Sequence, residues 1–118
     1  MLPRAQRLTS TLDFSRVVRH GARFSSPRLV LHIASPIPAS TETAESPARF
    51  GFVVSKLVGS APRRNRVRRQ LREIARSTSG AISGDVVIRA LPAAADATWE
   101  QLTADVALCL GKFHDARL

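Results

Sequence analysis

The sequence predicts a single α/β domain in which a small β-sheet carries helices on its surface. Three observations support this prediction. The chain has 118 residues, enough for one modest hydrophobic core. Helix-like and strand-like patterns alternate in the order helix, strand, strand, helix, strand, helix. No internal repeat or change of composition marks a boundary, so we expect one domain over residues 1–118.

A short helix is expected near the N-terminus. Residues 1–9 are basic and are expected to form an irregular arm. Ser10 can cap the helix that follows, and Gly21 can end it. Between them lies a short apolar stripe made of Leu12 or Phe14, Val17 and Val18.

Two strands are expected next. The segment "RLVLHIAS" at 28–35 is rich in apolar residues and lies between two prolines. Residues 36–48 have no apolar period and contain Pro, Ser and Thr, which is typical of a loop. The segment "RFGFVVS" at 49–55 predicts the second strand, and we expect it to pair with the first as a hairpin across that loop. Phe50 and Phe52 alternate with smaller residues and should share one sheet face.

The second half of the chain predicts helix, strand and helix. Gly59 ends the second strand, Ser60 can cap a helix, and that helix should run to about Ser77. The segment "GDVVIRAL" at 84–91 predicts a third strand. A last helix follows with Thr98 as its cap, and its apolar residues recur at helical spacing. They are Trp99, Leu102, Val106, Leu110 and Phe113.

Positive charge is concentrated in one part of the chain. The net charge is +9, and residues 49–76 alone carry nine basic residues and one acidic residue. Such a local excess indicates a polyanionic partner, nucleic acid first and an anionic membrane second. No stretch approaches the ~20 apolar residues of a membrane span. With a single cysteine and no signal-peptide pattern, we expect a cytoplasmic protein.

The basic segment predicts a helix with two distinct sides. Its apolar residues should face the sheet: Val67, Leu71, Ile74 and Ala75. Its polar residues should face outward, with Asn65, Arg69, Arg72 and Arg76 opposite the core and Arg66 and Arg68 on the flanks. Guanidinium groups spaced about one turn apart can contact successive phosphates. A solvated face would mix its charges, so nucleic-acid binding is the favoured interpretation.

The sequence contains no recognisable catalytic constellation. Its three histidines are far apart in sequence and share no metal-ligand spacing with Cys109. The acidic residues form no cluster, and no P-loop or G-x-G-x-x-G motif is present. Cys109 lies near the apolar face of the last helix and is expected to be a buried structural thiol. We therefore assign no catalytic residue to this chain.

The segment "RFGFVVSKLVGSAPRRNRVRRQLRE" at 49–73 resembles the signature of the bacterial ribonuclease P protein component, whose hallmark is an Arg-Asn-Arg core. Residues 64–66 match that core. The segments "RLTSTLDFSRVVRHG" and "GDVVIRALP" resemble the first helix and a later strand of the family. The resemblance implies a two-layer α/β (α+β) sandwich with a mixed sheet and about three helices. It also implies a left-handed crossover around the basic helix, whereas the usual crossover is right-handed.

The resemblance also implies a function and a set of partners. The protein would join a catalytic RNA that removes the 5′ leader of precursor tRNA, with Mg²⁺ bound mainly by the RNA. No membrane and no obligate protein partner are expected. The residues implied to contact RNA are Lys56, Arg64, Asn65, Arg66, Arg68, Arg69 and Arg72. Those implied to line a cleft for the leader are Phe14, Val18, Val30, His32 and Val53.

Three positions depart from the family pattern. Val18 and His32 stand where aromatic residues are frequent, and Leu57 stands where a second lysine is common. The alternative function is a structural RNA-binding protein of the ribosomal type, with the same basic helix but no processing role. A DNA-binding regulator would need a helix before the basic one, where a strand is predicted. A free-standing nuclease lacks the necessary residues.

Overall fold

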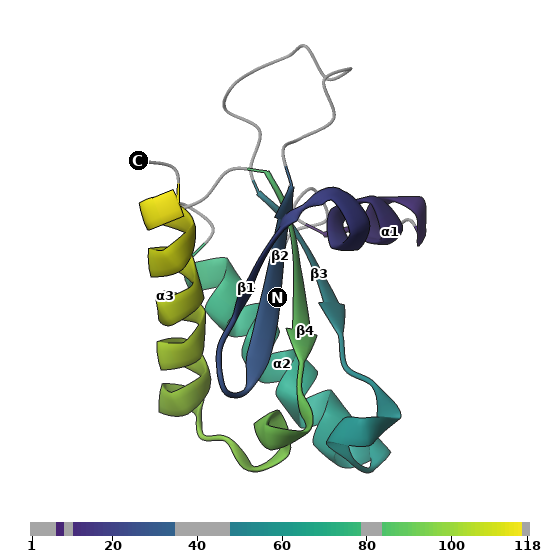
Figure 1. The fold of residues 1–118 in the computed structure, drawn as a ribbon. Coiled ribbons are helices and arrows are strands. Elements are labelled where there is room, and N and C mark those ends of the chain that lie inside the picture. Colours follow the sequence, from purple (N-terminus) through teal and green to yellow (C-terminus); the bar gives the residue numbers. More distant parts are fainter. Residues whose placement is uncertain (1–6, 9–10, 35–47, 79–83, 117–118) are drawn as a thin grey trace.

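In a computed structural model of the chain, the structure describes residues 7–8, 11–34, 48–78 and 84–116 (Figure 1). The order of elements agrees with the predicted α/β alternation, with one additional strand and two 3₁₀ helices. The elements are α1 (Thr11–His20), β1 (Ala22–Ser25), β2 (Leu29–Ala34), β3 (Arg49–Val53), η2 (Lys56–Val58), α2 (Ala61–Thr78), β4 (Asp85–Ala90), η4 (Pro92–Asp96) and α3 (Trp99–Ala116).

The four strands form one mixed sheet in the order β1-β2-β4-β3. β2 is antiparallel to both of its neighbours, whereas β3 and β4 are parallel. In Figure 1, β3 and β4 both run downward, β3 lies to the right of β4, and α2 passes behind the sheet. This arrangement is a left-handed β-α-β crossover, as the resemblance implied. The mixed sheet and the three α-helices confirm the predicted fold class.

The predicted hairpin between the strands at 28–35 and 49–55 is wrong. β2 pairs with β1 on one side and with β4 on the other, and β3 pairs with β4. The reason is burial. Val86, Val87 and Ile88 of β4 are fully buried on both faces, so this strand occupies the centre. The strand β1 was not predicted because it is short, lies at the edge and has one apolar residue of any size, Phe24.

The two faces of the sheet are covered differently. α2 and α3 cover one face, where the main core contains Leu29, Leu31, Phe50 and Ile88 with Phe52 packed against it. The other face is called the open face here. By strand register and alternation it carries Arg23, Ser25, Val30, His32, Ala34, Arg49, Gly51, Val53, Asp85, Val87 and Arg89. Among the described residues, α1 is the one helix on this face, and it covers one end of it (Figure 1).

The helix ends agree with the sequence, for partly different reasons. α1 ends at His20, but Gly21 is needed for close packing: a Cβ there would lie 2.7 Å from the Ile33 carbonyl oxygen. Ser10 lies outside the described residues. The predicted cap of α3 is confirmed, because Thr98 and Gln101 form a reciprocal capping box. Trp99, in contrast, was expected in the core and is 41% exposed.

Residues 1–9 were expected to form an irregular arm. The two of them that the structure describes, Arg7 and Leu8, instead pair with β3. Arg7 forms a parallel bridge with Phe50, and the Leu8 amide donates to the Phe50 carbonyl at 2.8 Å. Leu8 is buried against Val17 and Val87. Of the predicted loop at 36–48, the structure describes Ala48, which is buried in the main core. No helix in the described ranges combines the length and apolarity needed to span a bilayer.

Candidate nucleic-acid interface

The orientation of α2 is set by its apolar side. Val67, Leu71, Ile74 and Ala75 are all buried against the sheet, as predicted. Their burial forces the opposite side of the helix outward. That side carries the exposed residues Asn65, Arg66, Arg69, Arg72 and Arg76. Arg63 is also exposed but lies at the border, in the first turn and four residues before Val67. These six residues are called the basic face here. Arg64 and Arg68 are half-buried on its flanks.

Few carboxylates neutralise the basic face. Arg63 lies 3.8 Å from Asp96, and Arg76 lies 3.9 Å from Glu73. Within the described ranges, no carboxylate forms an ion pair with Arg64, Arg69 or Arg72. Neighbouring like charges on one helix destabilise it by a few tenths of a kcal/mol per pair. An external polyanion would relieve that repulsion.

Two of the predicted RNA-binding arginines also contact the protein itself. The Arg66 guanidinium donates to the Ala95 carbonyl at 2.6 Å and so joins α2 to η4. The Arg68 guanidinium donates to the Asn65 side-chain oxygen at 3.3 Å. A guanidinium has five N–H donors, so both arginines keep donors for a ligand. Arg66 therefore has a structural role that its position in the Arg-Asn-Arg motif did not reveal.

Lys56 lies on the short connection between β3 and α2. Ser55 accepts a hydrogen bond from the Leu57 amide and begins η2, which exposes Lys56. Gly59 then turns the chain with a φ of 142°, a conformation that other residues rarely adopt. The connection is short, so it keeps Lys56 close to the first turn of α2.

A surface cavity joins the basic helix to α1. Among its lining residues, Arg68 and Arg72 come from α2, Phe14 from α1 and Gly51 from β3. The remaining lining residues are Arg7, Leu8, Phe50 and Phe52. A Cβ on residue 51 would lie 2.3 Å from the Phe14 ring, so the ring rests directly on the glycine. The cavity thus combines three arginines with three phenylalanines and has no carboxylate in its lining.

The five residues predicted for the leader cleft are only partly accessible. Val30 and His32 lie on the open face but are 2% and 4% exposed. Phe14 and Val53 are half-buried, and Val18 is 41% exposed on α1. Phe14 and Val53 pack against the same small apolar cluster. Phe14 is the predicted cleft residue that the structure brings together with predicted RNA-binding residues.

The open face also carries two arginines that the sequence reasoning did not select. Arg23 is directly opposite His32, and Arg89 is directly opposite Val30. Both arginines are exposed. Strand alternation could have found Arg89, because it follows Val87 by two residues and must share its face. Arg23 could not be found, because β1 itself was not predicted.

His32 should make the stability of the protein depend on pH. Burial, and next the nearby Arg23 and Arg89, hold the pKa of His32 below its usual 6.5. The unfolded chain therefore binds a proton that the folded chain does not, and stability falls as the pH drops below 6.5. The limiting slope is about 1.4 kcal/mol per pH unit for one proton. Urea unfolding at several values between pH 7.5 and 5.5 should show this loss.

The variant His32→Leu separates this effect from other titrations. Leucine has no proton to gain, so the variant should lose less stability than the parent protein over the same pH range. The acidic groups titrate in both proteins and cancel in the comparison. Equal pH dependence in the two proteins would show that His32 is not the responsible group.

Buried ion pairs hold α1 in place on the open face. Asp85 of β4 is 2% exposed and accepts two hydrogen bonds of 2.8 Å from the Arg49 guanidinium. Arg16 of α1 binds the same carboxylate, and Asp13 of α1 lies 3.6 Å from Arg49. The hydrogen bonds that Arg49 donates to Asp85 raise the pKa of Arg49 above its usual value. The four side chains tie α1 to β3 and β4, and so fix the position of Phe14.

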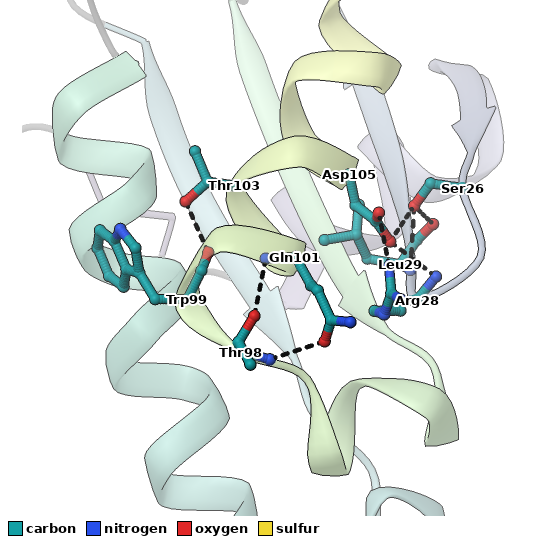
Figure 2. A network of polar contacts seen from close by, with 8 residues as sticks. All are labelled: Ser26, Arg28, Leu29, Thr98, Trp99, Gln101, Thr103 and Asp105. Carbon is teal, nitrogen blue, oxygen red and sulfur yellow. Dashed lines mark hydrogen bonds and ion pairs between the residues drawn. The ribbon is translucent and has the colours of Figure 1, made fainter.

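A second buried carboxylate fixes α3 (Figure 2). Asp105 accepts hydrogen bonds from the Arg28 amide at 2.9 Å, the Arg28 guanidinium at 3.1 Å and the Ser26 hydroxyl at 3.1 Å. These contacts join α3 to the turn between β1 and β2. Cys109, one turn further along α3, is fully buried, and burial raises the pKa of its thiol. The predicted burial of Cys109 is confirmed.

Comparison with known proteins gives a consistent result. Residues 2–114 match the family described as Ribonuclease P. The chain is 41% identical to the ribonuclease P protein component of Corynebacterium diphtheriae, covering 99% of this chain and 100% of that protein. It is 44% identical to that of Streptomyces avermitilis, covering 90% and 89%. The solved ribonuclease P protein of Staphylococcus aureus is similar in fold, with a TM-score of 0.76, 25% identity, and coverage of 90% and 93%.

Proposed function

The chain belongs to the ribonuclease P protein family, and from that premise we propose how its surfaces divide the work of a tRNA-processing ribonucleoprotein. Members of this family are protein subunits of an endoribonuclease, and their partner in it is the ribonuclease P RNA. We propose that the basic face of α2, with Lys56, docks on that RNA, and that Arg72, where this face borders the cavity, also reaches the leader. The cavity at Phe14 and the open face would take the single-stranded 5′ leader of precursor tRNA.

The lining of the cavity is the observation that supports separate surfaces for the RNA subunit and the leader. The cavity brings Phe14 to Arg68 and Arg72, so an aromatic ring and two guanidinium groups converge where α1, β3 and α2 meet. A single strand needs a stacking surface and cations spaced along its backbone. Arg23 and Arg89 extend the positive charge across the open face. A strand that leaves the cavity over this face would therefore remain among cations.

The Mg²⁺ ions of the reaction are proposed to be held mainly by the RNA. Among the described residues, no three His, Cys, Asp or Glu side chains gather as metal ligands. Asp85 and Asp105 are buried and bound to arginines, so neither carboxylate faces a ligand site. The contribution of this chain would be to bind and orient the two RNAs. A cytoplasmic location, and a complex without an obligate second protein, are part of the same proposal.

The decisive experiment is reconstitution at low Mg²⁺. Purified protein is added to a bacterial ribonuclease P RNA, and cleavage of precursor tRNA is measured against RNA alone and protein alone. We expect cleavage with both components and none with protein alone. RNA binding without stimulation of cleavage would favour the structural, ribosomal-type alternative. Cleavage by nuclease-free protein alone would contradict the assignment of catalysis to the RNA.

Phe14→Ala should reduce affinity for precursor tRNA with a leader more than affinity for mature tRNA. Stacking of one base on an aromatic ring contributes about 1–3 kcal/mol, and only precursor tRNA has a leader base to stack. The measurement is the dissociation constant of each tRNA with the reconstituted ribonucleoprotein, at matched folded fraction. Leu12→Ala is the matched control, because Leu12 is on the same helix and 83% exposed. Equal losses for the two tRNAs would remove Phe14 from the leader site.

A further inference from the structure

Trp99 is the most accessible aromatic side chain of the protein. The chain has five Phe, one Trp and no Tyr, and all six aromatic residues lie in the described ranges. Phe50 is buried and the other four phenylalanines are half-buried, whereas Trp99 is 41% exposed. An indole ring that stays in water forgoes a large amount of apolar burial. Neither the family resemblance nor the basic face accounts for it.

The backbone that carries Trp99 is firmly fixed (Figure 2). Thr98 accepts a hydrogen bond from the Gln101 amide at 3.1 Å, and the Gln101 side chain accepts one from the Thr98 amide at 3.0 Å. The Thr103 hydroxyl donates to the Trp99 carbonyl at 2.8 Å. Further along the helix, Asp105 joins α3 to the β1–β2 turn. The indole is therefore presented from a rigid helix start, which lowers the entropy lost when a ligand binds.

The surroundings of Trp99 include the basic helix. In Figure 2 the indole extends away from Asp105 and toward α2. The preceding segment, η4, is held to α2 by the hydrogen bond from Arg66 to Ala95 at 2.6 Å and by the ion pair of Arg63 with Asp96 at 3.8 Å. Trp99 follows these two residues of η4 within about one helical turn of chain. The start of α3, which carries the ring, is thus anchored next to the border of the basic face that holds both guanidinium groups.

We propose that Trp99 stacks on an unpaired base of the ribonuclease P RNA while Arg63 and Arg66 contact phosphates beside that base. The inference rests on the proposed function, because it requires that the basic face dock on RNA. Aromatic rings next to arginine are the usual platform for unpaired bases. A paired strand offers no free base face, so the contacted RNA segment must be a loop, bulge or junction.

The position of Trp99 assigns the base to the RNA subunit and not to the leader. α3 packs against β1 and β2, whereas the cavity lies at the opposite edge of the sheet, beside β3. Arg68 and Arg72, which line the cavity, lie on the other flank of α2 from Arg63 and Arg66, so a strand in the cavity would have to cross α2 to reach Trp99.

Two acidic residues lie close to Trp99 in the chain. Asp96 is paired with Arg63, whereas Glu100 is exposed and would repel a phosphate. If RNA binds here, Glu100→Gln should increase the affinity for RNA by removing that negative charge.

The test uses the fact that Trp99 is the one tryptophan of the chain, so intrinsic fluorescence reports on it alone. The protein is titrated with a bacterial ribonuclease P RNA and, separately, with a leader oligonucleotide. Acrylamide, which is uncharged, measures the accessibility of the ring. We expect quenching and loss of acrylamide access with the RNA subunit and little change with the leader. Trp99→Ala should weaken RNA binding roughly 5- to 140-fold, and Trp99→Phe should weaken it less.

Leu108→Ala is the matched control, because Leu108 is 47% exposed on the same helix. Its affinity should stay within about twofold of the parent protein. Salt-dependent RNA binding with unchanged fluorescence and accessibility would overturn the Trp99 inference and leave the proposed function standing. Unchanged affinity of Trp99→Ala, or equal quenching by the leader alone, would also overturn it. Absence of any RNA binding would instead contradict the proposed function itself.

Discussion

Replacing Asp85 with alanine should lower the free energy of unfolding by about 3 kcal/mol, the low end for a broken buried pair, because it leaves two half-buried guanidinium groups without their carboxylate. Asp85 is 2% exposed and binds both Arg49 and Arg16. Without its carboxylate, the two guanidinium groups would face each other across the end of the sheet, with Asp13 as the neighbouring acidic group. Urea denaturation monitored by circular dichroism measures the change directly.

The matched control is Asp96→Ala. Asp96 is also paired with an arginine, Arg63, but it is 88% exposed and the pair is 3.8 Å apart. Such surface pairs contribute about 0.2–1 kcal/mol, so this variant should unfold nearly as the parent protein does. Similar losses in the two variants would contradict the assignment of Asp85 as the anchor of α1. Both substitutions remove an aspartate that is paired with arginine, but the two sites differ in burial and in the closeness of the pairing.

The elements predicted correctly from the sequence are those whose apolar residues recur with one clear spacing. The spacing of Val67, Leu71 and Ile74 was enough to orient α2, because a helix of 18 residues repeats the same face several times. The same argument placed Leu102 and Val106 of α3 in the core. It failed for Trp99, which occupies the first turn of α3, where the apolar face reaches the edge of the protein.

Strand pairing could not be predicted from local pattern. The sequence shows which residues of β2, β3 and β4 alternate, but the order of strands depends on which strand is buried on both faces. β4 satisfies that condition with Val86, Val87 and Ile88. The left-handed crossover was implied by the family resemblance, whereas the general preference for right-handed crossovers would have predicted the opposite hand.

The cavity escaped prediction for a related reason. It depends on Gly51 lying under the Phe14 ring and on Arg7 pairing beside β3, contacts between segments that are about 40 residues apart in the chain. Separate sets of RNA-binding and leader-binding residues could not show that Phe14 and Arg72 share one cavity. Whether these residues bind RNA stays a prediction, and α2 offers the most direct way to test it.

The double variant Arg69→Ala/Arg72→Ala should weaken RNA binding and reduce its salt dependence. Both side chains are exposed, and neither forms an ion pair within the described part of the chain. Removing one phosphate-binding guanidinium lowers the slope of log affinity against log salt concentration by roughly 0.9 on a duplex-like partner, so the slope should fall by about 1.8. Between about 50 and 200 mM salt, the parent protein would then lose about 12-fold more affinity than the variant.

These two arginines are better test positions than Arg64 or Arg66. Arg64 is half-buried, and Arg66 holds η4 through Ala95, so their removal would confuse binding with folding. The control is Arg19→Ala/Lys112→Ala, which removes the same charge from α1 and α3. Because Lys112 donates a hydrogen bond to the Ser25 carbonyl at 2.8 Å, the two double variants are compared at matched folded fraction. If only the total charge matters, the salt slope of RNA binding should fall equally in the two double variants. If the α2 arginines bind phosphates, the slope should fall only in Arg69→Ala/Arg72→Ala. A slope unchanged by the Arg69 and Arg72 substitutions would exclude the basic face as the RNA-docking surface, since these two exposed guanidinium groups would then bind no phosphate.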